Sequence, residues 1–396
     1  MFNHSTSEAL IHTPRAEGAP AARRLPRISR LMARAKAGWR RAFSNDMAVD
    51  LGTSNTIIYV PDEGVVLNEP SVIALNRNTH QVVAIGREAK VALGRQASGI
   101  RVVRPLKDGV IADFDAAELM LAYFLKSALS RHRLTNPRVL ICAPCEVGQI
   151  ERRALEDAAG RAGAKYVDIV EEPIAAAIGA GFDIQSGRIF MLVDIGGGTS
   201  DIAVLGFGGP VHMATLRVGG EKMDEAIALH VRHAHCLEIG ELTAESVKME
   251  LGRADQVADD ASFEVRGRDV RTGLPSVISI TGSEVRAALE PVVEQTVKGI
   301  QAALEELPAE VSAGLLESGI VVTGGGSKLA GLVARIARET GLDVRQVNSD
   351  AQSIAVVGAG KLFRDGDYTS IRELMLRRKA AKLVADSDWH AIDQAA

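Results

Sequence analysis

The chain has 396 residues, of which 46% are hydrophobic and 24% are charged. This composition is typical of a folded globular protein and excludes a disordered or fibrous chain. The formal net charge is -4, whereas a nucleic-acid-binding protein is expected to carry a basic excess. We therefore expect no nucleic acid partner.

Cysteine content and hydropathy give a first indication of the compartment. Three cysteines are too few for a disulfide framework, which favours a reducing environment. No apolar run reaches the roughly 18 residues that a membrane-spanning helix needs, and the first residues lack the pattern of a secretory signal. The sequence therefore predicts a cytoplasmic protein.

Residues 1–45 are predicted to form a flexible basic arm followed by an amphipathic helix. Residues 1–46 hold nine basic and three acidic residues, a local excess of +6. Apolar residues then recur with helical spacing, and arginines lie on the opposite side. A basic amphipathic helix with bulky apolar residues is typical of a segment lying in a membrane interface, and the alternative is a helix packed on its own domain. The residues expected to enter an anionic membrane surface are Ile28, Leu31, Met32, Trp39 and Phe43.

After residue 46 the chain alternates between strand-like and helical segments. The strand-like segments are short, β-branched and bounded by glycine or proline, as buried strands are. Strands are expected at residues 47–52, 56–60, 138–144, 190–196, 202–207 and 319–325. Helices are expected at residues 116–130, 150–163, 221–235, 283–307 and 327–341. The alternation predicts an α/β fold of more than one domain.

Two segments of the chain share one pattern. An apolar strand carries an aspartate, Asp50 or Asp194, and is followed by a glycine turn with Ser or Thr and by a second apolar strand. The repetition predicts two related domains, each with a β-hairpin turn at a common cleft. Backbone N–H groups of such turns bind phosphate oxygens. Because Asp50 and Asp194 would repel phosphate, the pair implies Mg²⁺ held through water beside a nucleotide.

A third glycine-rich segment, residues 323–327, follows another predicted strand. One such turn is weak support for a nucleotide site, but three at the ends of buried strands favour it. The G-x-x-x-x-G-K-[ST] and G-x-G-x-x-G fingerprints do not occur in their required settings. Two facing hairpin turns are instead the phosphate clamp of the superfamily of actin, sugar kinases and heat-shock chaperones, which the chain resembles over nearly all of residues 46–362.

Within that superfamily the sequence closely resembles the MreB family of bacterial actins, which direct rod shape. The motifs agree with that family in order and spacing, and LNEPS and RPLKDGVIADF are not expected of chaperones or sugar kinases. The motifs include VDLGTSNTIIYV (49–60), GVVLNEPSVIAL (64–75), RPLKDGVIADFD (104–115), VEEPIAAAIGAG (170–181), VDIGGGTSDIAVL (193–205), ESVKMELG (245–252) and VVTGGGSKLAGL (321–332).

The resemblance implies an actin-like fold, a duplicated ribonuclease H-like arrangement of two domains with a nucleotide cleft between them. Domain I would comprise residues 46–185, with a small subdomain at about 64–105. Domain II would comprise residues 186–358, with a small subdomain at about 222–285. Residues 359–396 would return to domain I and form a C-terminal tail.

The resemblance also assigns a binding role to the motif residues. ATP would be the cofactor, together with Mg²⁺ held through water by Asp50 and Asp194. The phosphate groups would lie between two turns, and the nucleoside between two further segments. The turns are Thr53, Ser54 and Asn55, and Gly197, Gly198 and Thr199; the nucleoside segments are Glu245, Ser246, Val247 and Lys248, and Gly325, Gly326, Ser327 and Lys328.

Glu172 and Thr199 would be the catalytic residues by the same resemblance. Hydrolysis of a γ-phosphate needs an oriented water more than a strong base, and a carboxylate with a hydroxyl can orient one. Glu172 also has a plainer interpretation, because acidic residues favour the first turn of a helix and a helical run follows it.

The implied function is ATP hydrolysis coupled to the assembly of filaments on the inner face of the cell membrane. Head-to-tail contacts between copies of an asymmetric subunit propagate into open filaments, and cleft closure around ATP would favour them. By resemblance the further partners would be proteins of cell shape and cell-wall synthesis. The alternatives are a divergent family scaffold, a chaperone-type ATPase and a small-molecule kinase.

Two groups of metal-binding residue types have plainer interpretations. Cys142 and Cys145 have C-x-x-C spacing, but they end an apolar strand and no second pair accompanies them. His230, His233 and His235 lie on one predicted helix, where His230 and His233 can share a face. Because no carboxylate stands at ligand spacing, a solvated helix face is favoured over a metal site.

Overall fold

The computed structural model describes residues 46–129, 137–145, 147–206, 208–255, 261–347 and 350–363. The predicted basic arm and amphipathic helix, with Ile28, Leu31, Met32, Trp39 and Phe43, lie outside the described residues, as does the tail beyond residue 363. Within these described ranges no helix is both long and apolar enough to span a bilayer.

The first large sheet has five strands in the order β10, β9, β1, β2, β3. The first three strands in the chain pair antiparallel, and the other two continue from β1 in parallel. The strands are β1 (Met47–Leu51), β2 (Asn55–Val60), β3 (Gly64–Pro70), β9 (Arg138–Ala143) and β10 (Tyr166–Glu171). Alternate side chains of β1 point to opposite faces of the sheet. Met47 and Val49 pack with α3 (Phe114–Ala128) and α4 (Gln149–Arg161), whereas Ala48 packs in a second core on the other face.

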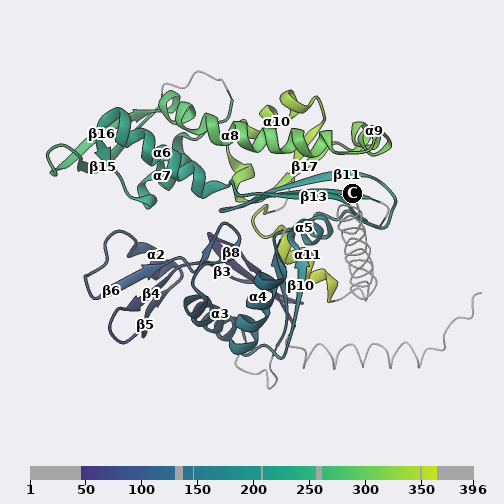
Figure 1. The fold of residues 1–396 in the computed structure, drawn as a ribbon, viewed down its shortest axis with the longest axis horizontal. Helices are drawn as coiled ribbons and strands as arrows, with labels where there is room; N and C mark the ends of the chain where they lie inside the picture. Colours follow the sequence, from purple (N-terminus) through teal and green to yellow (C-terminus); the bar gives the residue numbers. More distant parts are fainter. Residues whose placement is uncertain are drawn as a thin grey trace, which may run out of the picture. The chain divides into compact units, whose positions relative to one another are not determined.

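The second large sheet repeats this topology, in the order β13, β12, β11, β17, β18. Again three consecutive strands pair antiparallel, and two later strands continue from the first of them in parallel. The strands are β11 (Phe190–Ile195), β12 (Ser200–Gly206), β13 (Gly209–Leu216), β17 (Ile320–Thr323) and β18 (Val344–Gln346). One face is covered by α8 (Gly282–Glu305), α9 (Ala309–Ser318) and α10 (Leu332–Thr340), as Figure 1 shows.

Each large sheet is accompanied by a smaller three-stranded one. The first small sheet packs with α2 (Arg87–Val91) and consists of β4 (Ile73–Asn76), β5 (Val82–Ile85) and β6 (Ile100–Val103). The second small sheet packs with α6 (Gly220–His235) and α7 (Glu241–Leu251) and consists of β14 (Leu237–Glu238), β15 (Ser262–Asp269) and β16 (Pro275–Thr281). A short hairpin of β7 (Leu106–Lys107) and β8 (Val110–Ile111) precedes α3.

Helices α5 (Glu172–Gly179) and α11 (Ile354–Leu362) share one core with both large sheets. Their backbones touch at two glycines. A Cβ at Gly358 would lie 1.8 Å from the Ala175 carbonyl oxygen, and one at Gly179 would lie 2.1 Å from that of Ile354. The close crossing therefore requires residues without side chains, and it joins the two sheets through α5 and α11.

All six predicted strands are present, and four of the five predicted helices correspond to α3, α4, α6 and α8. The helix predicted over residues 327–341 is present as α10 (Leu332–Thr340), but its predicted start was five residues too early. The chain forms a 3-10 turn at Gly325–Lys328, and α10 starts only at Leu332. Gly331 separates them because its φ of 77° is left-handed and cannot continue a right-handed helix.

The α5–α11 crossing predicts a large cost for a single methyl group. Gly358→Ala should lower the free energy of unfolding by about 1–3 kcal/mol, because the helices must separate to admit the side chain. Denaturant titration would measure this change. Gly160→Ala is the control, because Gly160 is exposed on α4 and has nothing within 4 Å of an added Cβ. Equal effects of the two substitutions would contradict the proposed constraint.

Candidate nucleotide site

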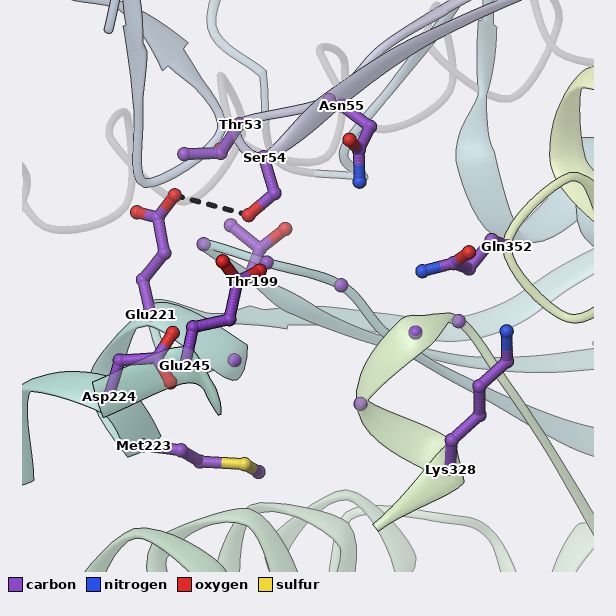
Figure 2. Close-up of a pocket in the computed structure, with 18 of the residues that line it drawn as sticks. Thr53, Ser54, Asn55, Thr199, Glu221, Met223, Asp224, Glu245, Lys328 and Gln352 are labelled. Carbon is purple, nitrogen blue, oxygen red and sulfur yellow. Dashed lines mark hydrogen bonds between the residues drawn. The ribbon is translucent and has the colours of Figure 1, made fainter. Parts of the chain in front are cut away.

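A cavity of about 540 Å³ lies between the β1–β2 and β11–β12 turns. It is lined by residues of both large sheets, of α6 and α7, and of the glycine-rich segment after β17. Figure 2 shows Thr199 close to Thr53 and Ser54 on one side of this space, with Lys328 and Gln352 on the other side. The three glycine-rich segments singled out by the sequence therefore meet at one cavity.

The two hairpin turns approach each other too closely for side chains on the second one. A Cβ at Gly197 would lie 2.1 Å from Ser54 Oγ, and one at Gly198 would lie 2.6 Å from Thr53 Oγ1. Consecutive glycines in the second turn thus serve a steric purpose, since they allow the hydroxyl-bearing turn to pack directly against backbone.

Each turn is held from behind by hydrogen bonds. Ser71 Oγ donates to the Gly52 carbonyl at 2.6 Å and also pairs with Thr56 Oγ1 at 2.9 Å, which fixes the first turn. The second turn rests on the start of α6, where the Glu221 N–H donates to the Gly197 carbonyl at 2.8 Å. Ser54 Oγ donates to Glu221 Oε1 at 3.1 Å, so α6 is tied to both turns.

The loop between β7 and β8 also reaches the turns, which the sequence analysis did not predict. The Gly109 N–H donates to Thr53 Oγ1 at 3.2 Å, and Gly109 lines the cavity. Asp108 and Gly109 both have left-handed φ values, of 51° and 78°. The Asp-Gly pair is a turn signal, and it lies within a motif that the resemblance used, but nothing local placed it at the site.

Three acidic side chains that line the cavity have raised pKa values. In the described part of the chain, no basic side chain offsets this rise. Burial raises the pKa of Asp50 to about 7. Burial likewise raises the pKa of Asp194, with added repulsion from Asp201 and Asp50, and the pKa of Glu172, with added repulsion from Asp50 and Asp194. Oxygen donors that repel one another in this way suit a hard divalent cation such as Mg²⁺, so the residues present fit the predicted ion.

Asp201 lies near this group but has protein partners of its own. Its Oδ1 accepts hydrogen bonds from the Cys145 N–H at 3.0 Å and from Thr215 Oγ1 at 2.6 Å. These bonds partly offset the effect of burial, which still raises the pKa of Asp201. Its role is therefore to anchor the β9 end to the second sheet.

The predicted nucleoside residues divide into two groups. Glu245, Lys248, Gly325, Gly326 and Lys328 line the cavity. Ser246, Val247 and Ser327 do not: Ser246 Oγ donates back to the Leu242 carbonyl in its own helix, Val247 is fully buried in the core, and Ser327 Oγ donates to the Gly324 carbonyl. The side chains of these three residues are therefore engaged elsewhere in the protein.

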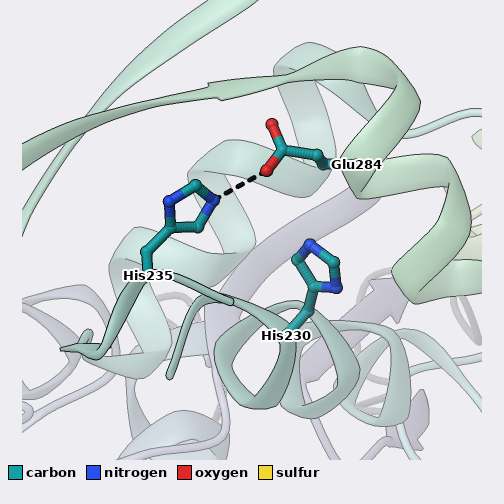
Figure 3. A group of neighbouring side chains, drawn as sticks. All are labelled: His230, His235 and Glu284. Atoms are coloured by element: carbon teal, nitrogen blue, oxygen red, sulfur yellow. Dashed lines mark hydrogen bonds and ion pairs between the residues drawn. The ribbon is translucent and has the colours of Figure 1, made fainter. Parts of the chain in front are cut away.

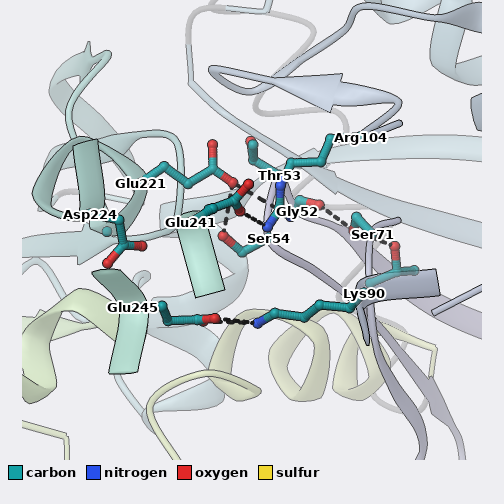
Figure 4. A network of polar contacts seen from close by, with 12 residues as sticks. Gly52, Thr53, Ser54, Ser71, Lys90, Arg104, Glu221, Asp224, Glu241 and Glu245 are labelled. Carbon is teal, nitrogen blue, oxygen red and sulfur yellow. Dashed lines mark hydrogen bonds and ion pairs between the residues drawn. The ribbon is translucent and has the colours of Figure 1, made fainter. Parts of the chain in front are cut away.

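Ion pairs connect the small-sheet regions across the cavity (Figure 4). Lys90 of α2 pairs with Glu245 of α7 at 2.6 Å, and Arg104 pairs with Glu241 of the same helix. Lys248 Nζ is held inside by Asp224 at 2.8 Å and by the Gly220 carbonyl at 2.9 Å. Glu245 and Lys248 thus already have partners that a bound ligand would have to exchange.

Glu172 both starts a helix and lines the cavity. It is the first residue of α5, with Pro173 beside it, as an acidic residue at a helix start should be. Its side chain also lines the cavity, as does that of buried Thr199 from the second turn. The helix start therefore delivers a carboxylate into the same space as the turns.

The raised pKa of Asp50 predicts a pH-dependent stability. Between the unfolded value of 3.8 and the folded value of about 7 the folded state binds the extra proton, so stability falls as the pH rises through this window. In EDTA without nucleotide, Asp50→Asn should therefore raise the melting temperature more at about pH 8 than at about pH 5. Asp157→Asn on the exposed surface of α4 is the control, and a gain that does not depend on pH would contradict the account.

Comparison with known proteins agrees with this geometry. Residues 44–370 match the family model described as MreB/Mbl protein. The cell shape-determining protein MreB of Escherichia coli is 42% identical over 328 residues, which cover 82% of this chain and 94% of that protein.

Solved structures give the same result. The crystal structure of MreB5 of Spiroplasma citri bound to ADP has a TM-score of 0.77 at 33% identity and covers 84% of this chain and 99% of that one. The MamK double helical filament has a TM-score of 0.68 at 26% identity, with 81% and 99% covered. The predicted actin-like α/β fold is confirmed, and the chain belongs to the MreB/Mbl family.

Proposed function

We propose that this protein binds and hydrolyses ATP in the cavity between the two hairpin turns and assembles into filaments that organise cell-wall synthesis. The main support for this proposal is that Gly197 and Gly198 pack directly on Ser54 and Thr53. Buried carboxylates line the same cavity. A site that presents backbone and hydroxyl donors beside acidic oxygens suits a phosphate chain that arrives with a cation.

Each element of the site has a separate task in the proposed reaction. Thr53, Ser54 and Asn55 and the Gly197–Gly198 backbone would hold the phosphates. Asp50 and Asp194 would hold Mg²⁺, which when bound supplies charge neutralisation for phosphoryl transfer. Gly325, Gly326 and Lys328 would lie along the nucleoside. The ADP bound in the MreB5 relative supports this assignment.

Glu172 and Thr199 are proposed to orient the attacking water. A carboxylate and a hydroxyl that face the same cavity from different elements can accept and donate hydrogen bonds to one water molecule. The α5 helix start fixes the Glu172 backbone, so its side chain has few ways to leave the cavity. Orientation of this kind accounts for hydrolysis without a strong general base.

The ion pairs across the cavity suggest how nucleotide state would change the subunit. Lys90 and Glu245 join α2 to α7, and Arg104 and Glu241 add a second link. A nucleoside that contacted Glu245 would compete with Lys90 for the same carboxylate. Binding and release of nucleotide would then alter the separation of the two small sheets, and with it any subunit contact that they make.

Replacement of Glu172 by Gln tests the hydrolytic proposal. The amide keeps the size of the side chain but no longer accepts two hydrogen bonds as an anion, so phosphate release should fall by at least about tenfold while ATP binding persists. Phosphate release and fluorescent-nucleotide binding measure the two effects. Glu156→Gln on exposed α4 is the matched control, and unchanged turnover in Glu172→Gln would remove this residue from the catalytic role.

Filament assembly is proposed from the family and from the solved filament of a relative. The curated relatives are named cell shape-determining proteins, and MamK is solved as a double helical filament. Self-association of this chain would be head to tail, since such contacts continue without closing. Proteins of cell shape and of cell-wall synthesis would be its partners, and ATP with Mg²⁺ would control assembly.

We place the filament on the cytoplasmic face of the cell membrane through the predicted basic helix of residues 28–43. Its arginines would face anionic headgroups while its apolar side enters the interface. This arrangement would hold the filament at the surface where the cell wall is made.

The membrane proposal has a direct test. Changing Trp39 and Phe43 to Ser should lower co-sedimentation with anionic liposomes by about tenfold, because each removes a large apolar side chain from the interface, and should leave phosphate release unchanged. Phe2→Ser is the control, since Phe2 lies outside the predicted helix. Full retention of liposome binding in the double variant would move the anchor to another segment.

A further inference from the structure

Three side chains of types that bind metals meet near the small sheet of β14, β15 and β16, apart from the cavity described above. His230 and His235 come from α6, and Glu284 comes from the start of α8. Their potential ligand atoms all lie within 4.8 Å of one another. Figure 3 shows the two imidazoles and the carboxylate converging from the facing helices.

The expectation that these histidines have no carboxylate neighbour was wrong. The carboxylate that seemed to be absent is supplied by α8, far along the chain. The pair that converges is His230 with His235, and exposed His233 is not part of the group. The end of α6 explains the geometry, because Cys236 adopts a left-handed φ of 51° and turns the chain away directly after His235.

Glu284 is held in position by the N-terminal cap of α8. Its Oε2 accepts hydrogen bonds from the Thr281 N–H at 2.9 Å and from Thr281 Oγ1 at 2.7 Å. The other oxygen, Oε1, lies 2.7 Å from His235 Nε2. The cap therefore uses one oxygen and directs the other toward the histidines.

His230 completes the group with an unsatisfied atom. Its Nε2 is buried and has no hydrogen-bond partner among the residues that the structure describes. Buried polar atoms without a protein partner are rare in folded proteins, and such atoms often contact a bound ion or water. This atom and the His235–Glu284 pair face a common point.

We propose that His230, His235 and Glu284 form a binding site for Zn²⁺. Two imidazole nitrogens and one carboxylate oxygen are a ligand set that zinc takes readily, whereas Mg²⁺ and Ca²⁺ prefer oxygen donors alone. Bonds of about 2.0–2.2 Å in a tetrahedron place ligand atoms about 3.3 Å apart. Small side-chain rotations would bring the observed ligand atoms to this spacing. The His235–Glu284 hydrogen bond would then be replaced by two metal bonds. Water would fill the fourth position.

The role of the ion would be structural. It would fasten the last turn of α6 to the first turn of α8 and so stabilise the region of β14, β15 and β16. The nucleotide cavity contacts the opposite end of α6, at Gly220 and Glu221. Zinc binding is therefore expected to be independent of nucleotide.

The test is zinc titration of the full-length chain, without an affinity tag and after treatment with a chelator. Isothermal titration calorimetry without nucleotide should find one Zn²⁺ per chain with a Kd of about 1 μM or tighter. His230→Ala and Glu284→Gln should each weaken binding at least about tenfold. Glutamine keeps the capping interaction at this position, and His230→Ala leaves the cap untouched, so at least one variant reports on a folded protein.

His233→Ala is the matched control, because it removes a histidine from the same helix but not from the group. Its zinc affinity should equal that of the unaltered protein. Cobalt replacement gives a second readout, since Co²⁺ in this site should show the visible absorption of four-coordinate cobalt and lose it in His230→Ala. The proposal is overturned if no stoichiometric site appears, or if His230→Ala and His233→Ala bind zinc equally well.

Discussion

The crossing of α5 and α11 is the contact on which the arrangement of the site depends. Both helices pack between the two large sheets, and they touch backbone to backbone because Gly179 and Gly358 carry no side chains. The sheets are thereby held at a fixed distance with their hairpin turns toward one cavity. A helix pair of ordinary width would separate the turns, and neither turn alone can enclose a phosphate chain.

The same constraint explains why the site is electrostatically costly without a ligand. Asp50 and Asp194 are buried beside Glu172. Burial raises the pKa values of all three, and repulsion from neighbouring carboxylates raises those of Asp194 and Glu172 further. Sites with such perturbed groups are commonly functional, and a bound cation relieves the strain that the fold imposes. In the proposed function, nucleotide binding with a cation would therefore stabilise the arrangement in which the two hairpin turns face one cavity.

The sequence predicted the features that follow from local sequence patterns and missed those that depend on packing between distant segments of the chain. The hairpins around Asp50 and Asp194 follow from strand and turn patterns, and Glu172 follows from a motif. The ion pair between Lys90 and Glu245 could not be predicted, because the two residues lie on helices that pack with different small sheets. Val247 was included with its neighbours in one motif, although a helix sends adjacent residues to different sides. Glu284 was missed for the same reason as Lys90: its partner histidines lie on another helix.

In the proposed function, nucleotide in the cavity between the two turns controls filament assembly. High-speed sedimentation of the full-length protein with Mg-ATP, with Mg-ADP and without nucleotide, followed by negative-stain microscopy of the pellets, tests it most directly. We expect ordered filaments with Mg-ATP and far fewer in the other two conditions. Protein that stays in the supernatant in every condition, with anionic lipid present as well, or that pellets equally with and without nucleotide, would contradict it.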